Sequence, residues 1–95
     1  MDNLVILYTM KGCPFCQMMK EKLTESMIDY HERDIDDHKD EYDLFVEITE
    51  NEYVPAFMVI ENSGSEEPIT SLFAPERDFN DLDEGIELIK NKLIL

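Results

Sequence analysis

Both cysteines of the chain lie in one short segment, 9–16, which reads Thr-Met-Lys-Gly-Cys-Pro-Phe-Cys. An apolar run, 4–8, leads into this segment, and a helix-compatible stretch, 14–27, follows from it. Pro14 suits the first turn of a helix, because the N–H that proline lacks has no partner there. The sequence therefore predicts a strand, a tight turn and a helix, with Cys13 at the helix N-terminus.

The two cysteines have different predicted surroundings. Unpaired backbone N–H groups and the positive end of the helix dipole favour the thiolate of Cys13 and lower its pKa. Cys16 falls on the same helix face one turn later, where it can form a disulfide with Cys13 but is less accessible to a substrate. We therefore predict that Cys13 is the nucleophile and Cys16 the resolving thiol. An acidic surface opposes the thiolate, and Lys11, the nearest basic residue in sequence, offsets part of that effect.

The charge of the chain restricts its partners. With 23 acidic and 8 basic residues, the 95-residue chain has a formal net charge of −15. Such a surface repels phosphate backbones and anionic membranes, and the basic residues are scattered, so we expect neither nucleic-acid nor membrane binding. An electropositive partner is compatible with this charge, although a well-solvated acidic surface is the simpler interpretation. The length predicts one domain, residues 1–95.

The N-terminal residues indicate the compartment. They include no basic region, and the apolar run that follows is too short for a signal peptide or a membrane span. We therefore expect a cytoplasmic, reducing location, where a Cys-x-x-Cys pair has a redox or metal-binding role. A structural disulfide is disfavoured, because closing so small a loop adds little stability.

Hydrophobic periodicity and turn signals predict seven elements in the order β-α-β-α-β-β-α. The expected strands are 4–8, 29–35, 54–60 and 69–73, and the expected helices are 14–27, a segment within 36–52, and a last helix that Asp78 caps with Asp81 at the capping-box position. The expected apolar faces comprise Met19, Leu23 and Met27 on the first helix, Tyr42, Phe45, Val46 and Ile48 on the second, and Leu82, Ile86, Ile89 and Leu93 on the third. The order predicts an α/β fold in which one four-stranded mixed sheet is flanked by three helices.

Val54 and Pro55 open the third expected strand, and the proline has two interpretations. It can be the start of an ordinary edge strand, where a missing hydrogen-bond donor costs nothing. It can also follow a cis peptide bond that is held beside the active site. Both interpretations are compatible with the sequence.

Taken with the element order, two motifs make the chain resemble the glutaredoxins, a branch of the thioredoxin fold. Leu7-Tyr8-Thr9 leads into Cys13-Pro14-Phe15-Cys16, and Val54-Pro55 follows later in the chain. Glutaredoxins typically have Cys-Pro-Tyr-Cys, so Phe15 keeps the aromatic ring and loses the hydroxyl. Thioredoxins usually have tryptophan directly before the first cysteine and Gly-Pro between the two cysteines. In this chain Gly12 stands directly before the first cysteine, and the chain has no tryptophan.

The resemblance implies a thioredoxin fold and a thiol–disulfide oxidoreductase with glutathione as reductant and co-substrate, and no tightly bound cofactor. Cys13 would take glutathione from a mixed disulfide, and Val54 would pair through its backbone N–H and C=O with the cysteinyl part of glutathione. The other glutathione contacts implied by the resemblance are Lys11, Phe15, Pro55 and Asp81. Disulfide-containing proteins would be the other substrates, and we expect a monomer.

Three features depart from the pattern of the resembled family. Met10 stands where a lysine is usual, which leaves Lys11 displaced by one position, and Tyr53 stands where threonine is usual. The Gly-Gly turn and following aspartate that hold the γ-glutamyl end of glutathione are replaced by the segment 73–82, in which Asp81 is the best match to that aspartate. These departures concern the glutathione contacts more than the dithiol chemistry.

Other functional classes fit parts of the sequence. A zinc site would need His31 and His38 beside the cysteines, and their separation is wider than in zinc fingers, so we predict no metal site. A [2Fe–2S] cluster shared between two monomers through Cys13 and glutathione occurs in some glutaredoxins and is disfavoured by Pro14. A non-catalytic interaction protein would use the acidic surface to dock a basic partner. The loss of the Gly-Gly turn is compatible with this class and also with a thioredoxin-like dithiol donor to a dedicated protein partner.

Overall fold

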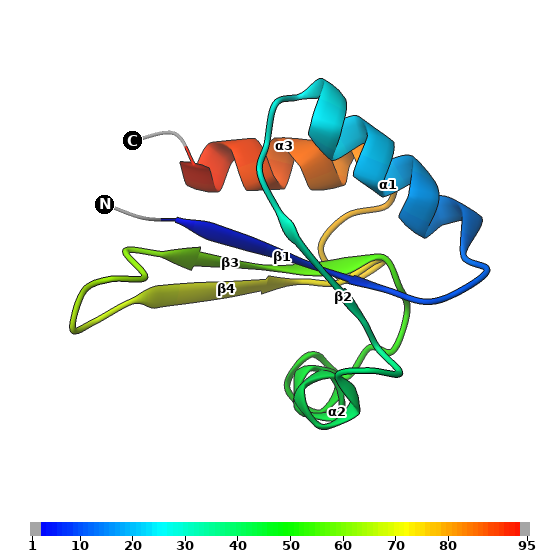
Figure 1. Ribbon diagram of the computed structural model, residues 1–95, viewed down its shortest axis with the longest axis horizontal. Coiled ribbons are helices and arrows are strands. Elements are labelled where there is room, and N and C mark those ends of the chain that lie inside the picture. The colour runs from blue at the N-terminus through cyan, green and yellow to red at the C-terminus, as the bar shows by residue number, and fades with distance from the viewer. Residues whose placement is uncertain (1–2, 94–95) are drawn as a thin grey trace.

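β1 (Leu4–Thr9) is the central strand of the fold, and all of its residues but the first are buried. It lies between β2 (His31–Asp34), to which it is parallel, and β3 (Ala56–Glu61), to which it is antiparallel. β4 (Ile69–Phe73) pairs with β3 in the antiparallel direction, so the strand order is β2-β1-β3-β4 (Figure 1). A continuous apolar run suits such a strand, because both of its faces are covered. The computed structural model describes residues 3–93.

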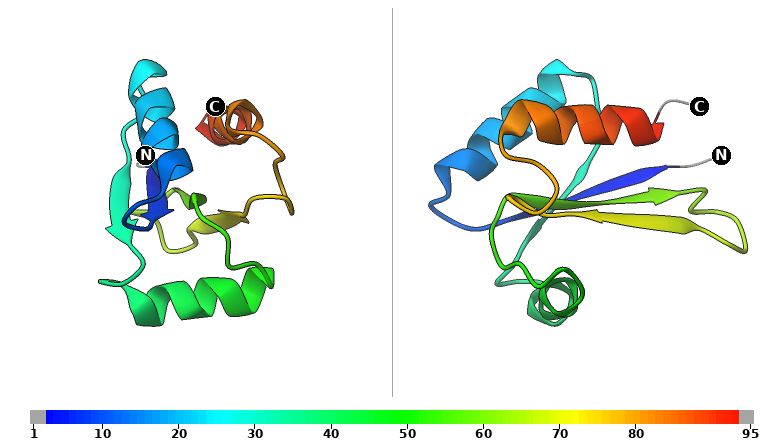
Figure 2. Two further views of the ribbon diagram at one scale, coloured as in Figure 1. Left: turned by 90° about the vertical axis from the view of Figure 1, so that its right-hand side faces the viewer. Right: turned by 180° about the vertical axis from the view of Figure 1, so that it is seen from behind.

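Helices cover both faces of the sheet. α1 (Pro14–Glu25) and α3 (Leu82–Leu93) lie side by side on one face, and α2 (Lys39–Thr49) covers the other (Figures 1 and 2). Residues of β1 alternate between the two faces. The core under α1 and α3 contains Val5, Leu7, Met19, Leu23, Ile28, Phe57, Val59, Phe73, Phe79, Ile86 and Ile89, and the core under α2 contains Ile6, Tyr8, Tyr42, Phe45, Ala56 and Ala74. Within residues 3–93, no helix has the length and apolar character needed to cross a membrane.

Tyr8 fixes α2 to the sheet. Its ring centroid lies 5.1 Å from that of Phe45, and its hydroxyl donates a hydrogen bond to the carboxylate of Glu41. Glu41 also forms an ion pair with Arg33 of β2. Burial, and then the hydrogen bond to Glu41, raise the pKa of Tyr8, so the hydroxyl remains a donor at neutral pH. The contacts of Tyr8 therefore join β1, β2 and α2.

The predicted α/β fold, with a four-stranded mixed sheet and three helices, is confirmed. The apolar face predicted for the first helix is correct except at Met27. α1 ends at Glu25, and Met27 takes a left-handed φ of 59° with a side chain that is 92% exposed. Ile28 packs into the core instead. The helix thus ends two residues earlier than its apolar periodicity indicates.

The apolar face predicted for the second helix is wrong at Ile48, which is exposed. The face that begins with Tyr42 and Phe45 continues through Thr49, which is buried. Thr49 satisfies its hydroxyl by donating to the carbonyl oxygen of Phe45, with 2.8 Å between the oxygens. A threonine with this internal partner can occupy a core position that the sequence pattern assigns to an apolar residue.

The last helix is capped by Asp81 and not by Asp78. The backbone N–H of Glu84 donates to Asp81 Oδ1 at 2.8 Å, and α3 begins at Leu82. Asp78 instead accepts a hydrogen bond from the backbone N–H of Ala74, also at 2.8 Å, and so stabilises the preceding loop. The apolar face predicted for this helix is confirmed.

Candidate active site

The disulfide of the chain lies where β1 leads into α1. Gly12 has a φ of 75°, a conformation that favours glycine, and it turns the backbone toward the helix. Cys13 is the N-cap residue in an extended conformation, and Pro14 is the first helical residue. The Cys13–Cys16 disulfide joins Cα atoms 5.2 Å apart, within the usual span. The structure therefore has the predicted strand, turn and helix, with the two predicted cysteines in contact.

The two cysteines differ in accessibility. Cys13 is partly exposed, whereas Cys16 is 2% exposed. The backbone N–H of Cys16 donates a hydrogen bond to Cys13 Sγ, with 3.1 Å between nitrogen and sulfur. An incoming disulfide can reach the first sulfur and is shielded from the second. This geometry suits a nucleophile at Cys13 and a resolving thiol at Cys16.

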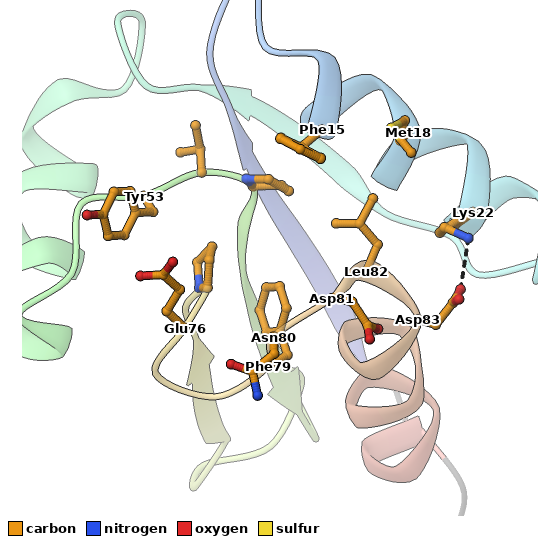
Figure 3. A pocket seen from close by; sticks show the side chains of 13 residues that line it. Phe15, Met18, Lys22, Tyr53, Glu76, Phe79, Asn80, Asp81, Leu82 and Asp83 are labelled. Atoms are coloured by element: carbon orange, nitrogen blue, oxygen red, sulfur yellow. Dashed lines mark hydrogen bonds and ion pairs between the residues drawn. The ribbon is translucent and has the colours of Figure 1, made fainter.

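The Val54–Pro55 peptide bond is cis. Pro55 precedes β3, which lies inside the sheet between β1 and β4, so the edge-strand interpretation of this proline is wrong. Val54 and Pro55 form part of a groove of about 590 Å³, which we call the α1–α3 groove (Figure 3). The groove is lined by Phe15, Met18 and Lys22 of α1, by Tyr53, Val54 and Pro55, and by Pro75, Glu76, Phe79, Asn80, Asp81, Leu82 and Asp83.

The structure brings together most of the predicted glutathione contacts. Phe15, Val54, Pro55 and Asp81 all line the α1–α3 groove. Lys11 is exposed in the turn before the disulfide and is not a lining residue. Four of the five predicted glutathione contacts thus line one groove, and Lys11 lies outside it.

The sequence did not point to Met18, Lys22 or Glu76 as groove residues. Phe15, Met18 and Lys22 follow one another at positions i, i+3 and i+7 of α1, which places them on one helix face. Helical periodicity counted from Phe15 could therefore have identified Met18 and Lys22. Glu76 lies in an irregular segment and has no periodic signal of this kind.

The charges of the groove are unequal. Lys22 Nζ lies 2.8 Å from Asp83 Oδ1, and this hydrogen bond raises the pKa of Lys22, so its ammonium group stays protonated at neutral pH. The charge of Lys22 thus offsets the charge of Asp83. Glu76 and Asp81 are the remaining carboxylates of the groove, and neither forms an ion pair within residues 3–93.

The segment between β4 and α3 forms a structured loop where the Gly-Gly turn would be expected. The backbone N–H of Glu76 donates to the carbonyl oxygen of Phe79 at 2.7 Å, and Glu76 has a left-handed φ of 67°. Asn51 Nδ2 donates to the carbonyl oxygen of Pro75, also at 2.7 Å. The ring of Phe79 stacks on that of Phe57, with centroids 5.2 Å apart. These contacts hold the loop as one wall of the α1–α3 groove.

The two histidines come from β2 and from the start of α2. His31 pairs with Ile6 on β2, at the opposite end of this ladder from Thr9, and His38 is the N-cap residue of α2. No group of three or more Cys, His, Asp or Glu side chains within residues 3–93 has an arrangement that could hold a metal ion.

The sequence of this site matches a known family. The glutaredoxin family model matches residues 5–62. The chain belongs to the glutaredoxin family. The matched part of this glutaredoxin contains both cysteines and the cis Val54–Pro55 bond, and it ends before β4. The wall of the α1–α3 groove that precedes and begins α3 lies outside the matched residues.

A solved structure shares the fold of this glutaredoxin. The crystal structure of a mutant of the thioredoxin-like protein BC3987 aligns with a TM-score of 0.57 and 19% sequence identity, over 95% of this chain and 99% of that chain. At this identity the likeness shows the thioredoxin-like fold alone. A search of curated protein sequences finds no match to the chain. The glutaredoxin family and the thioredoxin-like fold support a thiol–disulfide oxidoreductase.

Proposed function

We propose that this glutaredoxin reduces disulfides with a dithiol mechanism in which Cys13 is the nucleophile and Cys16 the resolving thiol. The observation that carries the proposal is the position of the disulfide. Cys13 is partly exposed at the N-terminus of α1, its Sγ accepts a hydrogen bond from the backbone N–H of Cys16, and Cys16 itself is buried. Helix N-termini stabilise thiolates, and thiolates are the attacking species in disulfide exchange.

The proposed reaction has two exchanges. The Cys13 thiolate attacks one sulfur of a substrate disulfide, R–S–S–R′, so that a Cys13–S–S–R bond forms and R′–S⁻ leaves. The Cys16 thiolate then attacks Cys13 Sγ, which forms the Cys13–Cys16 disulfide and releases R–S⁻. Two electrons pass from the protein dithiol to the substrate, and both released thiolates take up protons from water. The mechanism needs no resident metal or cofactor.

Glutathione is the proposed reductant that regenerates the dithiol. Two glutathione molecules would supply the two electrons and leave as oxidised glutathione. In this proposal Val54 pairs with the cysteinyl backbone of glutathione, and Phe15 and Pro55 contact its apolar parts. Asp81 Oδ1 already accepts the N–H of Glu84, so its other oxygen would meet the ammonium group of the γ-glutamyl end. Lys11, in the turn before Cys13, would pair with a glutathione carboxylate.

A dedicated protein partner is the second candidate for the electron donor or acceptor. The acidic loop beside α3 favours it, because the groove carries two unpaired carboxylates, at Glu76 and Asp81, and glutathione itself has two carboxylates. Like charges in proximity disfavour binding. We place either activity in a monomer in the reducing cytoplasm.

The test measures reduction of a glutathione mixed disulfide by the purified protein. One arm supplies glutathione and a glutathione-recycling reductase, and the other supplies thioredoxin reductase. We expect turnover with glutathione in the unmodified protein and none in Cys13→Ser. Turnover that persists in Cys13→Ser would contradict the assigned nucleophile. Absence of glutathione turnover, with a Cys13–Cys16 disulfide that thioredoxin reductase reduces, would instead support the dedicated protein partner.

A further inference from the structure

We propose that the α1–α3 groove docks the polypeptide around the reactive disulfide of a protein substrate, and that this polypeptide carries lysine or arginine next to an apolar side chain. The inference rests on the proposed function and names the class of substrate that the same site would accept. It is carried by the apolar side chains at the groove, by the charge of its walls and by its place beside Cys13.

Large apolar side chains are exposed at the groove. Phe15, Met18 and Tyr53 are 61%, 45% and 58% exposed, although all three line the same concave surface. Phe15 also lies between the two cysteines in sequence, so the groove adjoins the Cys-x-x-Cys motif through this residue. Exposed apolar side chains gathered in one concavity mark a binding surface more than scattered single residues do. The groove therefore offers contacts to apolar side chains of a docked polypeptide.

The charge of the groove selects the polar part of the same polypeptide. Its lining contains three carboxylates, at Glu76, Asp81 and Asp83, and one ammonium group, at Lys22. Lys22 pairs with Asp83 at 2.8 Å and attracts Asp81 more weakly, so the charge of Glu76 and part of the charge of Asp81 remain for a ligand. Arg77, which directly follows Glu76 in sequence, pairs with Asp78 at 2.9 Å and does not line the groove. A cationic segment is complementary to these walls, and an anionic one is repelled.

The positions of these groups indicate how such a segment would lie. Figure 3 shows Tyr53 and Glu76 at one end of the groove and the Lys22–Asp83 pair at the other, with Phe15 near the first turn of α1. A lysine or arginine side chain can rest its aliphatic stem or its charge against an aromatic ring while its charged group reaches a carboxylate. The Tyr53 and Glu76 end fits such a side chain. Asp81 lies toward the Lys22–Asp83 end, where the charge of Lys22 offsets part of the negative charge.

Docking adds no new chemistry to the reaction. The bonds that form and break are those of the two exchanges described above, and the electrons come from the Cys13 and Cys16 thiols. The groove acts on the rate at which a protein disulfide reaches Cys13, because complementary charge chiefly accelerates association and suppresses wrong partners. The proposal therefore concerns selection among protein disulfides.

The test compares three synthetic peptides that differ only beside one cysteine, which is held in a mixed disulfide with 2-mercaptoethanol. One peptide has lysine and leucine next to this cysteine, the second has glutamine and leucine, and the third has glutamate and leucine. Pre-reduced protein is mixed with each peptide at pH 7, and the peptide thiol that appears is quantified by chromatography. We expect the second-order rate constant to fall in the order lysine, glutamine, glutamate, with about a tenfold range at low salt. The range should shrink in about 0.5 M salt.

Matched variants locate the effect in the groove. Glu76→Gln should reduce the lysine-to-glutamate rate ratio by about threefold, as expected for one exposed ion pair. Glu47→Gln removes the same charge from the exposed side of α2, on the opposite face of the sheet, and should leave the ratio unchanged. Lys22→Gln should increase the ratio, because it frees the carboxylate of Asp83.

The outcomes separate this proposal from the one on which it rests. Equal rate constants for the three peptides would overturn the docking proposal and leave the oxidoreductase intact. An equal loss of ratio in Glu76→Gln and Glu47→Gln would also overturn it, because the net charge of the whole protein would then be the selective feature. Failure to reduce any of the peptides would overturn the proposed function, and the docking proposal with it.

Discussion

The backbone N–H of Cys16 donates a hydrogen bond to the Sγ of Cys13 across 3.1 Å. Cys13 is the N-cap residue of α1, so its sulfur takes the place that a serine or aspartate oxygen has in most helix caps. A thiolate in this position is an anion at a helix N-terminus, where the macrodipole stabilises negative charge. The sulfur proposed as the nucleophile is therefore also the atom that caps the helix.

The first prediction concerns the order of the two thiols. Cys16→Ser should stop the reaction after the first exchange, because no second thiol remains to attack Cys13 Sγ. We expect a mixed disulfide with the substrate to accumulate on Cys13 and to be visible in the intact mass of the protein. Cys13→Ser is the matched control and should form no adduct, since Cys16 is almost completely buried. An adduct on Cys16 in that control would reverse the assigned roles.

The second prediction concerns Phe79, which supports the wall of the α1–α3 groove. It is buried and stacks on Phe57 with centroids 5.2 Å apart. Phe79→Ala should lower the free energy of unfolding by about 3–5 kcal/mol, because it leaves a cavity in the core. Urea unfolding measures the change. Ile69→Ala on the exposed face of β4 is the control and should change the free energy by less than about 0.5 kcal/mol. Similar losses in the two variants would contradict the supporting role of Phe79.

Much of the fold follows from local features of the sequence. β1 is apolar from Leu4 to Tyr8 because both faces of a central strand are covered, and Pro14 marks the start of α1 because it needs no donor there. The end of α1 could not be predicted in the same way. Met27 continues the apolar period of the helix, but the backbone turns into a left-handed conformation at that residue. Such a turn depends on Ile28 reaching the core, which is a tertiary contact.

The candidate site was predictable in part for a related reason. The two cysteines and Pro55 belong to short motifs, and these motifs could be recognised without knowing what lies beside them. Glu76 and Lys22 come from segments that are distant in sequence, and they line one groove only when α3 packs beside α1. The cis geometry of the Val54–Pro55 bond was one of two readings that sequence allowed. The charge of the groove could therefore be read only from the folded chain.

The third prediction concerns the acid dependence of stability at Glu32. The hydroxyl of Thr9, which donates to Glu32 Oε2 at 2.8 Å, holds the pKa of this carboxyl below its usual range, and Lys20 at 3.1 Å acts in the same direction. The pKa of Glu32 is lower in the folded than in the unfolded chain. The contribution of its carboxylate to the free energy of unfolding is therefore present above about pH 4 and is lost as the pH falls through the pKa of the folded state. Since Glu32 is substantially exposed, the contribution is below about 1 kcal/mol.

Urea unfolding of the unmodified protein and of Glu32→Gln at several pH values tests this prediction. The difference in free energy of unfolding should be largest near pH 7 and should shrink toward about pH 3. A double-mutant cycle with Thr9→Val supplies the control, because Glu32→Gln should have a smaller pH-dependent effect once the hydroxyl is absent. A difference that stays constant between the two pH values would show that the carboxylate of Glu32 is not stabilised by folding.

The fourth prediction separates two roles of Asp81, which caps α3 and also lines the α1–α3 groove. Asp81→Ala should cost about 1 kcal/mol of stability and speed hydrogen exchange at the Glu84 amide, because that N–H loses its acceptor. Asp81→Asn should keep the cap, since asparagine caps helices about as well as aspartate, while it removes the charge from the groove.

Asp78→Ala is the control and should expose the amide of Ala74 and not that of Glu84. If Asp81→Asn keeps the Glu84 protection but lowers the preference for cationic peptides, the charge of Asp81 acts on the substrate independently of its cap. If the Glu84 amide instead lost its protection from hydrogen exchange in Asp78→Ala, Asp78 would be the residue that caps α3.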